Sequence, residues 1–179
     1  DKGDTKGAIA VLDAAVSDAE ALGEPGTTVL AELLGQRGYA ATQLFRLEAA
    51  EGDLQRSLKL VGNRSPVTAN GLRKHLANLL VLLNRREEAQ LQAADLLDSN
   101  RKLFGDAHPE TARAWVVVGK VAFYQRDEAL ALSAHDKAER IFKQTLGLPH
   151  PDFVDALVTR GAIEYDHGNL DRAVAITRE

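Results

Sequence analysis

A period of 42 residues runs through the chain and constrains its fold more than any other feature of the sequence. Stepping by this interval gives rows of small, of large, and of small to medium apolar residues. These rows are Gly35, Ala77, Gly119 and Gly161; Tyr39, Val81, Phe123 and Tyr165; and Leu47, Ala89, Ala131 and Ala173. Because the rows keep register without an insertion, the sequence predicts a repeat protein.

Each repeat contains two helical patterns. In ALALSAHDKAERIF, for example, apolar residues recur at helical spacing, and alternation typical of strands is absent. The first helices are expected at 27–46, 66–84, 109–125 and 151–167. The second helices are expected at 5–22, 47–61, 87–104 and 128–146, with a truncated one from Asn169. We therefore expect an all-α fold in which residues 1–179 form a single α-solenoid. Its repeats are 1–23 (partial), 24–62, 63–105, 106–147 and 148–179 (partial).

The row of small residues has a physical explanation. Two antiparallel helices that cross closely need a position without a bulky side chain, so that their backbones can approach. Gly35 and Gly119 are expected at such crossings, and the large residue four positions further on is expected to fill the neighbouring space.

These features together resemble the tetratricopeptide repeat. The resemblance rests on a small residue with Ala twelve residues later, on the polar turns DHGNLDRA and LNRREEA between them, and on Trp115 ahead of Gly119. That repeat ordinarily has 34 residues, and a period of 42 is similar to the longer form of kinesin light chains. The resemblance implies a right-handed superhelix of antiparallel helix pairs, with ligands along the concave face that the first helices line. A HEAT-like array, whose period overlaps, is the alternative fold.

One part of the kinesin light chain pattern is missing. Those proteins carry paired Asn residues in their first helices, whereas the matching positions here read Trp115-Val116-Val117-Val118, and only Asn78 is nearby. Kinesin-type cargo recognition is therefore not carried over.

Two His-Pro pairs, at His108 and His150, lie one period apart in LFGDAHPETARAW and TLGLPHPDFVDAL. Proline suits the first position of a helix, where its missing N–H has no partner in any case. The preceding glycines suit a residue of positive φ that ends the previous helix. No two histidines lie at i,i+4, and no cluster has metal-ligand spacing. We therefore interpret His-Pro as the joint between repeats, not as a metal or catalytic site.

Composition excludes several classes of function. Without cysteine, the chain has no disulfide, cysteine-ligated zinc or thiol nucleophile. A net charge of −4 argues against direct binding of nucleic acid, and no apolar run is long enough for a membrane span. The P-loop, the nucleophile elbow, the dinucleotide fingerprint and the kinase motifs are also absent. We expect no enzyme activity in these residues, no cofactor and no metal.

The candidate binding surface follows from helical periodicity. With the crossing residue as reference, positions three before, one after, and four or five after it are expected to face inward. They are Glu32, Gln36, Tyr39 and Ala40; Lys74, Asn78, Val81 and Leu82; Val116, Lys120, Phe123 and Tyr124; and Val158, Ala162, Tyr165 and Asp166. From these, with Arg113 at the edge, we select the peptide-binding residues Gln36, Tyr39, Lys74, Asn78, Arg113, Lys120, Phe123 and Tyr124. Long cations beside aromatic rings suit a peptide with acidic residues or a free carboxylate.

The sequence thus predicts a non-catalytic protein- or peptide-binding scaffold. The chain begins without Met and both of its ends lie within helical patterns, so we expect a fragment of a larger bacterial-type regulatory or signalling protein in the cytoplasm. The alternative is a self-association or spacer module of a multidomain protein, such as a Ser/Thr kinase or a transcriptional regulator, and a homo-oligomer stays open.

Overall fold

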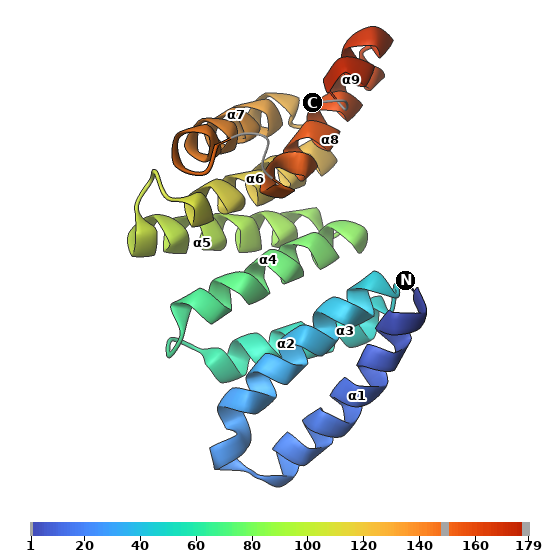
Figure 1. Cartoon of the computed structure of the whole chain (residues 1–179), viewed down its shortest axis with the longest axis vertical. Coiled ribbons are helices and arrows are strands. Elements are labelled where there is room, and N and C mark those ends of the chain that lie inside the picture. The colour runs from blue at the N-terminus through green and yellow to red at the C-terminus, as the bar shows by residue number, and fades with distance from the viewer. Residues whose placement is uncertain (1, 148–150, 177–179) are drawn as a thin grey trace. The chain divides into compact units, whose positions relative to one another are not determined.

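The computed structural model describes residues 2–147 and 151–176, and within these ranges every regular element is helical (Figure 1). The α-helices are α1 (Lys2–Ala21), α2 (Thr27–Gln43), α3 (Leu47–Val61), α4 (Pro66–Leu82), α5 (Arg86–Phe104), α6 (Pro109–Tyr124), α7 (Glu128–Thr145), α8 (Val154–Asp166) and α9 (Leu170–Ile176). Two 3-10 turns, η1 (Glu24–Gly26) and η2 (Pro151–Phe153), precede α2 and α8. The predicted all-α fold is confirmed.

The ends of the helices follow the predicted joints. The glycines Gly23, Gly62, Gly105 and Gly147 all have positive φ, as expected for residues that stop a helix. Several helices end earlier than predicted because a residue other than glycine takes a positive φ. Phe45, with φ of 56°, stops α2 at Gln43 instead of residue 46. Asn84 and Arg126, one period apart, do the same after α4 and α6, and Gly168 takes the corresponding position after α8.

The chain divides into two compact units, Asp1–Asn84 and Arg85–Glu179. The first unit contains α1 to α4 and the second contains α5 to α9. Their boundary lies inside the expected repeat 63–105, between its two helices. The division of the chain into five repeat segments stays a prediction, and each unit is described by itself below.

In the first unit, α1, α2 and α3 pack as antiparallel neighbours (Figure 1). Val16 and Ala19 of α1 are buried against Leu30 and Leu34 of α2. Between α2 and α3, the backbone of Gly38 lies close to that of α3, since an added Cβ would lie 3.1 Å from the carbonyl oxygen of Ala50 and 2.8 Å from Leu54 Cγ. The sequence pattern selected Gly35 for this role instead.

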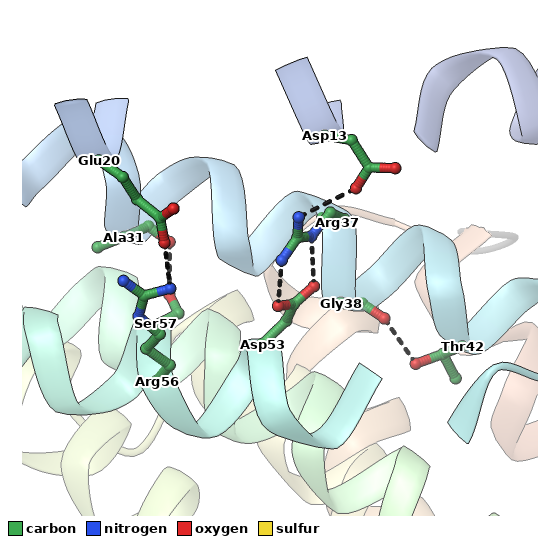
Figure 2. A network of polar contacts seen from close by, with 9 residues as sticks. All are labelled: Asp13, Glu20, Ala31, Arg37, Gly38, Thr42, Asp53, Arg56 and Ser57. Carbon is green, nitrogen blue, oxygen red and sulfur yellow. Dashed lines mark hydrogen bonds and ion pairs between the residues drawn. The ribbon is translucent and has the colours of Figure 1, made fainter. Parts of the chain in front are cut away.

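Arg37 joins three helices of this unit. Its guanidinium donates two hydrogen bonds of 2.7 Å to the carboxylate of Asp53 on α3 and one of 3.0 Å to Asp13 on α1 (Figure 2). The side chains of Arg37 and Asp53 are only 23% and 13% exposed. The paired carboxylates raise the pKa of Arg37 despite this burial. A second pair, Arg56 with Glu20, joins α3 to α1 at the surface (Figure 2).

In the second unit, α6 packs antiparallel to α7. Buried residues of these two helices form one cluster with Phe153 and Ala156: Ala112, Val116, Ala138, Ile141 and Phe142. Trp115 is half-buried against this cluster, and Lys137 Nζ lies 4.2 Å from the centre of its ring. The amide of Asn100 on α5 donates to the carbonyl oxygen of Glu110 at 2.8 Å, which fixes the start of α6.

The small residues of the repeat are predicted at places where two helix backbones approach closely. Gly35, Ala77, Gly119 and Gly161 are all buried. The space beside two of the glycines is filled by side chains, however, and not by backbone. A Cβ on Gly35 would lie 2.8 Å from Leu72 Cδ2, and one on Gly119 would lie 2.5 Å from Cε1 of His135. Glycine at these positions therefore makes room for one particular side chain each.

The large residue four positions beyond each small one is expected to fill the space beside the crossing, but two of these residues are exposed. Tyr39 is 47% exposed and Tyr165 is 65% exposed, whereas Phe123 and Val81 are half-buried. A residue four positions beyond a buried glycine lies about 40° around the helix from it, which is enough to reach the rim of the buried face.

Candidate functional site

A groove of about 340 Å³ opens between α2 and α4 of the first unit. These two helices run in the same direction, since Gly35 contacts Leu72 and, one turn later, Tyr39 contacts His75. The residues that line the groove recur at helical spacing on both helices. They are Ala31, Glu32, Gly35, Gln36 and Tyr39 of α2, and Thr68, Gly71, Leu72 and His75 of α4.

The floor of the groove is apolar, and few side chains project from it. Ala31 and Leu72 are buried, and Gly35 and Gly71 contribute only backbone. The hydroxyl of Ser57 on α3 donates to the carbonyl oxygen of Ala31 at 2.5 Å, which holds this part of α2 in place from behind. A ligand can therefore lie close to both helices.

Two aromatic rings close one end of the groove. The rings of Tyr39 and His75 lie 4.6 Å apart at an angle of 48°. Burial, together with the nearby charge of Lys74, lowers the pKa of His75 to about 4. His75 is therefore neutral at pH 7 and presents an uncharged ring.

The other end of the groove is polar. Glu32 lies two helical turns before Tyr39, and Thr68 lies two turns before His75. Glu32 is exposed and has no ion-pair partner among the residues that the structure describes. Gln36 lies between Glu32 and Tyr39 on the same side of α2. The groove thus has a carboxylate at one end and aromatic rings at the other.

The structure brings together only some of the predicted binding residues. Gln36 and Tyr39 line the groove. Lys74 and Asn78 are half-buried on α4 and lie outside the lining. The binding role of all four stays a prediction.

The other four predicted residues lie on α6 in the second unit. Arg113 pairs with Glu110 one turn earlier, and Lys120 Nζ lies 3.5 Å from Asp155 of α8. The rings of Phe123 and Tyr124 meet edge to face, with centres 5.5 Å apart. Both cations on α6 therefore already have a carboxylate partner.

Two residues of the wider inward-facing set are placed differently from the prediction. Ala40 and Val116 are buried in the cores of their units. Helical periodicity predicts which face of a helix a residue lies on. When a neighbouring helix packs against one side of that face, the residues on that side are buried and the others stay exposed.

Sequence reasoning missed Thr68, Gly71, Leu72 and His75, which form the α4 wall of the groove. Their spacing of three and four residues is a helical stripe and was visible in the sequence. However, counting the inward-facing positions from Ala77 selected a different stripe of α4, which begins at Lys74. The sequence of one helix does not show which flank its neighbour covers.

The interpretation of His-Pro as a joint is confirmed at His108. Its Nδ1 accepts a hydrogen bond of 3.1 Å from the backbone N–H of Glu110, and its ring stacks on Phe104. Pro109 then begins α6. His150 lies outside the described residues. Within the described ranges, no group of His, Asp and Glu side chains is arranged to hold a metal ion.

A different histidine is unusual. His135 of α7 is fully buried, and neither of its ring nitrogens has a hydrogen-bond partner among the described residues. Burial, and secondarily the charge of Arg160, lower its pKa to about 4, against weaker opposite effects of Asp136 and Asp155. The second unit therefore contains a neutral imidazole that is costly to protonate.

The buried imidazole predicts a loss of stability in mild acid. Because the pKa of His135 is lower in the folded chain than its ordinary value of 6.5, the unfolded chain binds the proton more readily. The neutral imidazole therefore contributes fully to the free energy of unfolding above pH 6.5. This contribution is lost as the pH falls toward 4, by about 2 kcal/mol for each 1.5 pH units. Urea unfolding of wild type and His135→Leu at several pH values would measure this. His75 contributes in the same direction, so the variant should keep a weaker pH dependence; equal slopes in both proteins would contradict the prediction.

The packed helix pairs of both units identify the chain as an α-solenoid, a helical-repeat fold. The crystal structure of BtubC (BKLC) from P. vanneervenii has a similar fold, with a TM-score of 0.74 and 17% sequence identity, over 96% of this chain and 70% of that chain. At this level of identity the similarity shows the fold alone. No protein-family model matches the sequence, and no curated protein matches it. Among the described helices, none combines the length and apolar character needed to cross a membrane.

Proposed function

We propose that the chain is a tetratricopeptide-type scaffold that binds a protein or peptide, and that it serves as the interaction domain of a larger bacterial-type regulatory or signalling protein. The groove between α2 and α4 is the observation that supports this most directly. It is open, it is lined by two first helices of the repeat, and it includes Gln36 and Tyr39. Its size, about 340 Å³, suits one or two side chains of an extended partner. We propose no catalytic role, because the sequence carries no catalytic motif.

The proposed preference for acidic residues now depends mainly on Lys74. Arg113 and Lys120 have carboxylate partners, whereas Lys74 has no ion pair among the described residues. Asn78 lies one turn further along α4, where its amide can bond a peptide backbone. A partner carboxylate is therefore expected at Lys74, beside the groove.

Selection of peptides from a random displayed library against the 179-residue chain would test the proposed function. Calorimetry with the selected peptides should show that Tyr39→Ala weakens binding about tenfold, as expected for an aromatic anchor. Phe45→Ala is the matched control, because Phe45 is an exposed aromatic residue of the same unit that does not line the groove. Failure to select any peptide, or equal binding by the two variants, would contradict the proposal.

Self-association is the second candidate, and a specific observation favours it. In the second unit, Val154, Val158 and Tyr165 of α8 and Leu170 and Val174 of α9 are large apolar residues that are exposed. Exposed apolar faces of this kind occur at protein interfaces. A protein that remains monomeric at high concentration in analytical ultracentrifugation would exclude this candidate.

A further inference from the structure

We propose that the groove between α2 and α4 binds an arginine side chain of the partner, with its guanidinium at Glu32 and its alkyl stem against Tyr39 and Leu72. This inference rests on the proposed function and identifies the chemistry of one subsite. It differs from the acidic contact expected at Lys74, which lies outside the lining of the groove.

Charge complementarity is the first argument. Glu32 is the only carboxylate among the residues that line the groove, and no cation lines it. Nor does the described part of the chain supply a partner for the Glu32 carboxylate. Elsewhere in the same unit, carboxylates that face a neighbouring helix are paired, as Asp53 and Asp13 are with Arg37. None of the residues that line the groove is a cation that could pair with Glu32 in the same way.

The shape of the groove is the second argument. Between its two ends the floor consists of Leu72 and of the glycine backbone at Gly35 and Gly71. An added Cβ on Gly71 would meet no atom within 4 Å, so this stretch is open above the helix. A long alkyl chain can bury its length along such a floor and keep its charged end in contact with water.

The polar groups at the ends favour arginine over lysine. Glu32 and Thr68 lie on opposite walls at the same end, and Gln36, whose amide can accept a hydrogen bond, lies one turn further on. A guanidinium has five N–H donors in a planar fork and can bond a carboxylate with two of them, whereas an ammonium acts as a point charge. The exposed ring of Tyr39, at the other end of the groove, offers an apolar surface for the stem.

The direct test titrates N-acetylarginine amide into the full chain and follows the backbone and methyl resonances of α2 and α4 by NMR. Binding in the millimolar range is expected, with the largest shifts at Leu72 and Ala31. The citrulline analogue, which is nearly isosteric and uncharged, should bind several-fold more weakly, and N-acetylglutamate amide should not shift these resonances.

Glu32→Gln should weaken the binding of N-acetylarginine amide about threefold to fivefold. Glu48→Gln is the matched control, because Glu48 is an exposed carboxylate of the same unit outside the groove, and it should leave the affinity unchanged. Absence of saturable binding, equal binding of citrulline, or equal affinity in Glu32→Gln would overturn the inference.

The outcome also separates this inference from the proposed function. If library peptides bind in the groove but show no preference for a basic residue there, the function stands and the arginine subsite is wrong. If N-acetylarginine amide binds and no library peptide does, the subsite exists and the proposed peptide-binding function fails.

Discussion

Replacing Gly119 with alanine should lower the free energy of unfolding by about 2 kcal/mol or more. The new Cβ would lie 2.5 Å from Cε1 of His135 and within 2.8 Å of both ring nitrogens. His135 is fully buried, so its ring can move only by displacing packed neighbours. The steric cost should exceed the gain of up to about 1 kcal/mol that alanine brings to the interior of a helix. Urea unfolding of the two proteins would measure the difference.

The sign of this effect should reverse when the imidazole is removed. In a His135→Ala background the Cβ added at position 119 would have room, and Gly119→Ala should then be neutral or stabilising by up to about 1 kcal/mol. Gly52→Ala is the matched control for helix propensity, because Gly52 lies within α3 and an added Cβ would meet no atom within 4 Å. If Gly119→Ala costs the same with histidine and with alanine at position 135, the contact with His135 is not the cause.

Replacing Arg37 with leucine should lower the free energy of unfolding by about 2 kcal/mol. The change leaves the Asp53 carboxylate, only 13% exposed, without its two hydrogen bonds from the guanidinium. It also removes the link from α2 to Asp13 on α1 (Figure 2). Urea unfolding at constant pH and ionic strength would measure the loss.

The neighbouring surface pair provides a control for this prediction. Arg56 and Glu20 also join two helices, but their side chains are 49% and 43% exposed, and Arg56→Leu should cost no more than about 1 kcal/mol. The double variant Arg37→Leu/Asp53→Leu should regain part of the loss, because it removes the unpaired carboxylate as well. A double variant less stable than Arg37→Leu alone would show that the cost comes from lost packing and not from the isolated charge.

The sequence was sufficient to predict the class of fold and most of the helices. The predicted bounds of α3, residues 47–61, agree with the structure, because an apolar stripe and a following glycine define both of its ends. The end of α2 was missed because Phe45 adopts a positive φ, which its residue type does not suggest. Residue patterns specify a helix well, but they do not show where a residue other than glycine takes the positive φ that ends it.

The candidate site was predicted only on one of its walls. Gln36 and Tyr39 were found because they lie one and four positions beyond Gly35, on the exposed side of α2. His75 and Thr68 were missed because their helix presents several possible stripes, and only packing against α2 selects one. The ion pairs of Arg113 and Lys120 were likewise not foreseen, since each depends on where a side chain from another turn or helix lies.

The strained turn after α6 has a consequence for how unfolding spreads through the second unit. Arg126 takes a positive φ that glycine would adopt more easily, and its guanidinium lies 3.4 Å from Asp166 at the end of α8. In an array of helix pairs, stability is the sum of what each pair contributes and of what neighbouring pairs add at their contact. The ion pair of Arg126 with Asp166 is a contribution at the contact between adjacent helix pairs. Gly168, at the equivalent place one period later, takes the same positive φ but has no side chain that could form such an ion pair.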